Sequence, residues 1–335
     1  MILIRIVGLA AMWFLLSAAA EPAWEYKVQA GGEISEAPHG VLNLGLRHGE
    51  FVAQLYTDTL DLRWNRELGY GRLWLGSRFA AFAAELFIAP WQEGRYAPEQ
   101  GVLAMYGELS TGYVHYLPAH FYAGVQLEAR RYQFKPRSDV VRDENIPANT
   151  WRLNSATFIG YWTDPLKARV QAGLDYLTDA NERLTPWLQA ELLYHPKTWL
   201  FTPFAEFRGG LLVSSSGTSS SIIRFRFGGM NPYAIPLAGW SWGEAWAQYY
   251  AAGRVGVEYN SRSYGASVFS DYAYLAQGAG LTEQALGVGG SLWWILGDWR
   301  LDLSSGYAPV ANRAQDAKIP PVSGWIAIGR EWDSF

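Results

Sequence analysis

A serine between glycines is the first pattern in this chain that could do chemistry. Gly239-Trp240-Ser241-Trp242-Gly243 has the spacing of the G-x-S-x-G turn that presents a nucleophilic serine in hydrolases. That arrangement needs a histidine base later in the chain, and none follows Ser241. We therefore interpret the pattern as a loop sequence and expect neither an enzyme nor a catalytic residue. The alternative is a membrane-embedded lipid hydrolase, in which Ser241 would meet His115, His120 or His195 at the membrane boundary.

Metal, cofactor and nucleic-acid sites lack the residues they usually need. The chain has no cysteine, which excludes disulfides and thiolate metal sites, and its histidines are scattered. Asp139, Asp143 and Glu144 are interpreted as a solvated loop, and no phosphate-binding or dinucleotide motif is present. The 27 Lys+Arg against 31 Asp+Glu include no basic run. We expect no metal, no cofactor and no nucleic-acid partner.

The first twenty residues have the composition of a secretory signal peptide. Arg5 precedes an apolar run at 6–16, and Ala18 and Ala20 fit the small-residue cleavage pattern before Glu21. An uncleaved anchor is the alternative, but a spanning helix usually needs about 20 apolar residues. We expect residues 1–20 to be removed and the remainder to be exported.

The remainder alternates between apolar and polar residues with a period of two. In 120–130, HFYAGVQLEAR, Phe121, Val125 and Leu127 share one face while Gln126 and Glu128 share the other. A soluble β-sandwich would also alternate. However, the apolar faces are long enough to cross a bilayer, the polar faces carry opposite charges, and aromatic residues collect at segment ends. The pattern predicts an all-β, antiparallel transmembrane barrel in the bacterial outer membrane, in contact with outer-membrane lipids.

We predict sixteen strands, with fourteen as the fallback because bacterial barrels have even counts. The expected strands are 41–48, 51–64, 70–78, 79–90, 103–117, 120–134, 151–162, 166–177, 184–195, 199–213, 221–228, 247–259, 264–275, 284–296, 299–308 and 322–332. The strands at 70–78 and 79–90 alternate poorly and could form one long strand. The expected organisation is a signal peptide at 1–20, a short periplasmic segment at 21–38 and the barrel at 39–335.

The last third of the chain resembles a known superfamily. The resemblance covers 224–259, 268–275, 285–310 and 324–332, with Gly228-Gly229 at the end of the expected eleventh strand. This order is similar to the C-terminal half of the surface-antigen and hemolysin-activator superfamily of outer-membrane barrels. The resemblance implies sixteen strands, a role in inserting or translocating proteins, and a loop at 229–246 that folds back into the lumen. It also implies partners, namely the outer-membrane assembly machinery and a separate periplasmic protein.

Three departures from that superfamily are visible. The expected loop tip is Ala238-Gly239-Trp240, without the arginine of the superfamily. The strand motif around Phe269 and Asp271 has Ala273 where the superfamily has glycine. We also expect no polypeptide-transport-associated domains, because the chain has no room for them. The insertion function therefore has alternatives, a passive pore for small solutes and the lipid hydrolase.

Ionisable residues on strands should face the lumen, because a charge in hydrocarbon is costly. Parity places Phe225 and Phe227 on the lipid face. The inward charges are Arg224, Arg226, Arg254, Glu258 and Asp271. They would form either a stiff salt-bridged lumen or a latch or selectivity lining. Since the tip lacks an arginine, we expect Asp271 to pair with Arg226 or Arg254, and the loop to be less firmly tied.

The C-terminus carries an expected assembly signal. Ile326, Ile328 and Trp332 share one face, so we place the end of the last strand at Trp332. Phe335 would then be a short overhang beyond the signal.

Overall fold

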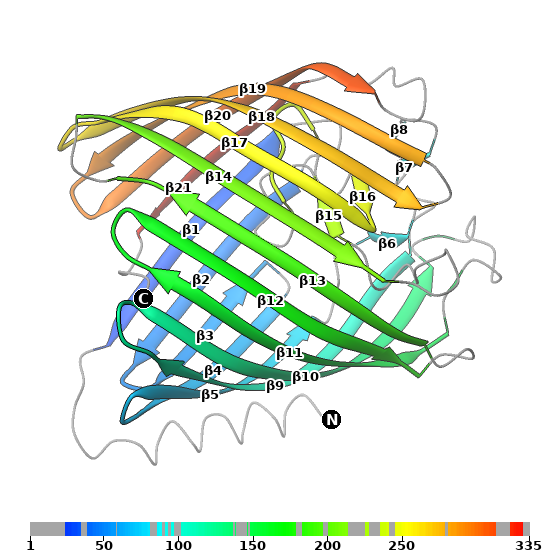
Figure 1. The fold of residues 1–335 in the computed structure, drawn as a ribbon. Helices are drawn as coiled ribbons and strands as arrows, with labels where there is room; N and C mark the ends of the chain where they lie inside the picture. Colours follow the sequence, from blue (N-terminus) through cyan, green and yellow to red (C-terminus); the bar gives the residue numbers. More distant parts are fainter. Residues whose placement is uncertain are drawn as a thin grey trace.

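The structure is a computed structural model in which the wall of a barrel is described almost completely. It describes residues 24–34, 39–57, 59–80, 86–88, 91–92, 95–96, 102–136, 138, 146, 148–178, 183–196, 200–213, 225–227, 235–240, 245–278, 281–312 and 322–330. Among these residues, no helix has the length and apolar character needed to cross a membrane. Long antiparallel strands, inclined to the barrel axis, enclose a central space (Figure 1).

Sixteen strands form the described wall, each antiparallel to its neighbours. They are β1 (Glu25–Ile34), β2 (His39–His48), β3 (Phe51–Tyr56), β4 (Thr59–Leu68), β5 (Gly71–Ala80), β9 (Val102–Tyr116), β10 (Phe121–Pro136), β11 (Thr150–Trp162), β12 (Leu166–Leu177), β13 (Arg183–Tyr194), β14 (Phe201–Leu212), β17 (Tyr249–Asn260), β18 (Tyr264–Gly278), β19 (Leu281–Leu296), β20 (Trp299–Asn312) and β21 (Val322–Arg330). Pairing of β1 with β21, from Val28↔Arg330 to Ile34↔Gly324, closes the ring. The predicted fold class and strand number are therefore confirmed.

Five short strands are not part of this ring. β6 (Leu86–Ile88) pairs with the start of β9, and β7 (Trp91–Gln92) pairs with β8 (Arg95–Tyr96). β15 (Phe225–Phe227) and β16 (Ala245–Ala247) pair with each other.

The expected strand boundaries are wrong in four places, and the errors cancel in the total. Residues 25–34, expected in a periplasmic segment, form β1, which pairs with both β2 and β21, so the barrel begins before residue 39. The range 51–64 contains a turn and belongs to β3 and β4. The ranges 79–90 and 221–228 supply no separate wall strand among their described residues. β1 escapes sequence analysis because EYKVQAGGEI has few large apolar residues. Residues 1–20 lie outside the described part.

The two faces of the wall follow the predicted alternation. On β10, Val125 and Leu127 are 50% and 56% exposed on the outer face, whereas Tyr132 and Phe134 are buried on the inner face. The outer faces of other strands carry similarly exposed Leu, Val, Ile and aromatic residues. An apolar exterior over a wall of paired backbone groups is a surface made for lipid.

The two ends of the barrel differ in the length of their connections. At one end two residues join β2 to β3, β4 to β5 and β19 to β20, and Gly69 and Gly297 in two of these turns have φ of +59° and +64°. Glycine suits these positions because it has no Cβ to clash in the left-handed region. The longest connections lie at the other end. In outer-membrane barrels short turns face the periplasm and long loops face outside.

Substitutions at neighbouring positions on β10 test the face assignment. Val125→Arg puts a charge on the lipid face and is expected to cost about 2–4 kcal/mol near the membrane midplane. Gln126→Arg places the same side chain in the lumen and should cost far less. Unfolding titrations from lipid vesicles measure both, and equal costs would contradict the assignment.

Candidate functional site

The described parts of the connection between β14 and β17 lie in the lumen. β14 pairs directly with β17, from Phe201↔Tyr259 to Leu211↔Tyr249, so the intervening chain contributes nothing to the wall there. β15 and β16 lie within the outline of the barrel (Figure 1). The rings of Phe225 and Phe227 lie 4.8 and 5.0 Å from the ring of Tyr250, which faces inward from β17. We call the described parts of this connection, residues 225–227, 235–240 and 245–247, the inner segment.

The inner segment corrects the expected eleventh strand. The sequence pattern predicts Phe225 and Phe227 on the lipid face, but Phe227 is fully buried inside the barrel. The eleventh wall strand is instead β14, so the connection that follows still occupies the position that the resemblance implies. Arg224, Gly228 and Gly229 lie outside the described residues, as does the side chain of Arg226.

The tip of the inner segment is seated on the inner wall. The Ala238 backbone N–H donates to Asp271 Oδ2 at 2.8 Å, and the Gly239 N–H donates to Ser323 Oγ at 3.1 Å. Ala238 and Trp240 are 6% and 1% exposed. The structure therefore brings Ala238, Gly239 and Trp240 together on the lumen side of β18 and β21.

Two wall glycines make room for this tip. A Cβ on Gly287 of β19 would lie 2.6 Å from the Ala238 carbonyl oxygen, and one on Gly306 of β20 would lie 2.7 Å from the Ala238 Cβ. Contacts that short do not occur, so any side chain at either position would displace the tip. Its close approach therefore depends on glycine in the wall.

An arginine from the wall neutralises Asp271. Arg254 Nε donates to Oδ1 at 2.6 Å and Nη2 donates to Oδ2 at 2.8 Å, a two-point, charge-assisted contact. The guanidinium carbon also lies 4.1 Å from the Phe269 ring centroid. The predicted pairing of Asp271 with an inward arginine is confirmed, and of the two candidates, Arg226 and Arg254, the partner is Arg254. We call Arg254, Phe269, Asp271 and Ala238 the latch.

The latch holds the tip of the inner segment through a backbone hydrogen bond, which the sequence did not predict. The missing tip arginine suggested a loosely tied loop, but Asp271 still binds the tip through the Ala238 backbone N–H. That donor exists for any residue except proline, so no tip side chain is required. Three hydrogen bonds satisfy a carboxylate that is only 3% exposed.

Glu258 does not join the latch. It lies four residues along β17 from Arg254, where Asn260 donates to it and His195 Nε2 lies 3.5 Å away. The latch and Glu258 are therefore separate groups on the lumen side of the wall.

Sequence analysis missed an ion-pair ladder across four strands on another part of the lumen wall. Arg78 of β5 donates to Asp61 of β4 at 2.8 Å and lies 3.7 Å from Glu108 of β9. Arg130 of β10 donates to Glu108 at 2.5 Å. These residues face each other in the registers Asp61↔Arg78, Arg78↔Glu108 and Arg130↔Glu108. Parity indicates that each faces inward, but only the strand register shows that they meet. Next to the ladder, Arg152 binds Asp175 at 2.6 Å.

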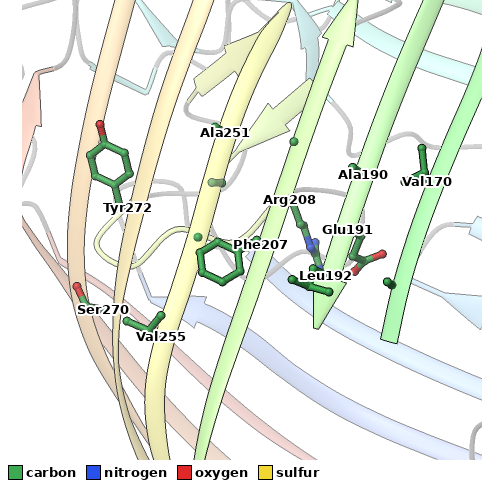
Figure 2. Close-up of a pocket in the computed structure, with 14 residues that line it drawn as sticks. Val170, Ala190, Glu191, Leu192, Phe207, Arg208, Ala251, Val255, Ser270 and Tyr272 are labelled. Atoms are coloured by element: carbon green, nitrogen blue, oxygen red, sulfur yellow. Dashed lines mark ion pairs between the residues drawn. The ribbon is translucent and has the colours of Figure 1, made fainter. Parts of the chain in front are cut away.

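The hollow shown in Figure 2 lies on the outer face of the wall, on the opposite side of β17 and β18 from the latch. Small residues, among them Ala190 and Ala251, lie between larger outward side chains. Leu192, Phe207 and Val255 are 39%, 49% and 50% exposed. The hollow has a volume of about 640 Å³ and a mainly apolar lining. Acyl chains would fill such a surface in a membrane, so it is no route for solutes.

Only some of the remaining predicted site residues lie within the described part of the chain. Ile326 and Ile328 are each 44% exposed on the outer face of β21, as the assembly signal requires, while Trp332 and Phe335 lie outside the described residues. Ser241 also lies outside them. Within the described ranges no group of three metal-ligating side chains occurs.

Comparison with known proteins identifies the fold. No family model and no curated protein matches the chain. CdiB from Acinetobacter baumannii has a TM-score of 0.65 at 12% identity over 93% of this chain, which spans 60% of that structure. BamA from Haemophilus ducreyi lacking POTRA domains 1-3 has a TM-score of 0.64 at 9% identity, over 91% of this chain and 70% of that one. CdiB from Escherichia coli has a TM-score of 0.63 at 11% identity, over 92% and 64%.

This is a bacterial outer-membrane β-barrel. The closed wall, its apolar exterior and these neighbours agree on that conclusion. The resemblance seen in the sequence is confirmed at the level of the fold.

Breaking the latch tests its contribution to stability. Asp271→Asn keeps the side-chain shape but removes the carboxylate partner of Arg254. We expect a loss of about 2–3 kcal/mol, below the 3–5 kcal/mol typical of fully buried pairs, because the Arg254 side chain is 19% exposed. Urea unfolding from lipid vesicles measures the loss.

The matched control breaks an exposed pair. Asp302→Asn removes the partner of Arg300 in a pair whose side chains are 52% and 31% exposed, so its expected cost is below about 1 kcal/mol. Equal losses of unfolding free energy in the two variants would show that the Arg254–Asp271 pair stabilises the barrel no more than a surface ion pair does.

Proposed function

We propose that this barrel inserts or translocates proteins at the outer membrane and that the inner segment closes its lumen at rest. The observation that carries the proposal is the seating of the tip against four wall strands, through Asp271, Gly287, Gly306 and Ser323. A chain segment that packs against the inner wall in this way is suited to closing the lumen and to opening it by moving. The fold shared with CdiB and BamA supports the same class of function by analogy.

Apolar packing inside the barrel also supports a lumen that is closed at rest. One cluster of inward residues lies near the long-connection end, and Phe225 packs against it. Its members are Ala80, Val102, Ala104, Tyr106, Tyr132, Phe134, Leu177 and Leu212. A second cluster combines Phe227, Leu237 and Trp240 of the inner segment with inward residues of β17 to β20. Hydrated solutes are poorly accommodated by such packing, so a passive pore is the less favoured function.

The wall contains one seam between strands that are distant in sequence. β1 and β21 pair from Val28 to Ile34, and Arg330 of β21 also donates to the Tyr26 hydroxyl of β1, whereas the other neighbouring wall strands follow one another along the chain. Opening this pair would expose two strand edges to which a client strand could add. We propose that clients enter the membrane here and that a separate periplasmic protein delivers them to the short-turn end.

Conductance in planar bilayers tests the closed lumen. The unaltered protein is expected to stay mostly closed, whereas Gly306→Ala is expected to displace the tip and raise the conductance several-fold. Gly209→Ala is the matched control, because its added Cβ meets nothing closer than the Tyr250 carbonyl oxygen at 3.6 Å. A large, steady conductance in the unaltered protein would support a passive pore instead.

Insertion of a urea-unfolded outer-membrane barrel into lipid vesicles tests the function itself. Vesicles that contain this protein are expected to fold the client faster than empty vesicles. A disulfide between Ala30→Cys and Ile328→Cys, paired across the seam, should abolish the gain. A disulfide between Leu303→Cys and Ile326→Cys, paired within the wall, should not. The absence of any gain would contradict the insertion function.

A further inference from the structure

The outer face of β10 carries two cations beyond its apolar stretch. Arg131 and Lys135 are exposed, whereas the intervening Tyr132 and Phe134 are 1% and 7% exposed and pack inside the barrel. Strict alternation therefore places both cations on the lipid side of the wall. Gln133, between them on the same face, is also exposed.

The neighbours of these cations are apolar or aromatic. Arg131 lies opposite Gly107 of β9 and Trp151 of β11, and its guanidinium carbon is 5.7 Å from the Trp151 ring centroid. Lys135 lies opposite Leu103. Within the described part of the chain, neither cation has a carboxylate within ion-pair distance. Their arrangement contrasts with the lumen, where Arg78, Arg130, Arg152 and Arg254 all have acidic partners.

The position of Arg131 along β10 sets its depth in the membrane. It lies ten residues after Phe121, the first residue of the strand. At about 3.4 Å per residue the distance is about 34 Å, and a tilt of about 45° reduces it to a height of about 24 Å. The apolar band of such barrels is about 25 Å tall, so Arg131 lies at its upper edge and Lys135 lies above it.

That edge lies toward the long-connection end, which faces the cell surface. Lipid headgroups at this level can carry phosphate, which the forked guanidinium of arginine binds at two points and lysine binds as a point charge. A bound phosphate would give both cations the anionic partner that the wall does not supply.

We propose that Arg131, Lys135 and Trp151 form a binding site for the phosphate-bearing headgroup of a glycolipid in the outer leaflet. The two cations bind phosphate, Gln133 donates a hydrogen bond to the headgroup, and the Trp151 ring lies at the boundary with the acyl chains. The site is on the outside of the barrel and is independent of the inner segment and of client insertion.

Binding of purified lipid A to the folded protein in detergent tests the site. Each cation near a membrane surface contributes on the order of 1 kcal/mol, so Arg131→Gln together with Lys135→Gln should weaken binding about 30-fold. Dephosphorylated lipid A should bind the unaltered protein about as weakly. Native mass spectrometry measures the bound fraction, and electrophoresis without heating shows that each variant is folded.

Lys167→Gln is the matched control. Lys167 also lies over a tryptophan, 5.0 Å from the Trp162 ring centroid, but next to a short turn at the opposite end of the barrel. It should bind lipid A like the unaltered protein. Equal binding by the double variant, or an equal loss in Lys167→Gln, would overturn the site. Competition by millimolar inorganic phosphate as effective as that by lipid A would overturn a lipid as its occupant.

Discussion

The absence of water in the hydrocarbon part of a membrane constrains every part of this molecule. Each backbone N–H and C=O must find a partner in the chain, so a strand cannot remain at an edge. Pairing of β1 with β21 removes the last two edges and makes the wall continuous. Closure also separates the two faces of every strand, one toward lipid and one toward a narrow interior.

The narrow interior explains the ion pairs. Charged side chains in the middle of the wall strands turn inward, where burial would be costly without partners. Partners are provided by alternating charges on adjacent strands in the ladder of Asp61, Arg78, Glu108 and Arg130. Beneath the inner segment, Arg254 and Asp271 are partners of each other. Asp271 has a second task, because one of its oxygens also accepts the Ala238 N–H. Neutralising the carboxylate and seating the tip thus depend on one side chain.

The inner segment shows how backbone contacts can replace a side-chain lock. With no arginine at its tip, it is held by two backbone N–H groups and by close packing against Gly287 and Gly306. These contacts involve β18 to β21 but not the hydrogen bonds that close the wall. The tip could therefore leave its seat while the wall stays intact, which is what a gated lumen requires.

The sequence by itself determined the fold class and the face of most strands, because alternation with a period of two is a local property. Its strand number agrees with the structure only because two missed wall strands offset two expected ones that are not in the wall. The sequence also limited the partner of Asp271 to Arg226 or Arg254, since these residues face inward and a buried carboxylate needs a partner, and the structure shows Arg254. It could not separate a wall strand from a hairpin inside the barrel, because RFRF alternates equally well in both places. Nor could it find β1, whose small and polar residues form a strand through pairing with β2 and β21. Register, closure and the seat at Gly287 and Gly306 were decided only by the tertiary structure, because they join residues that are distant in the chain.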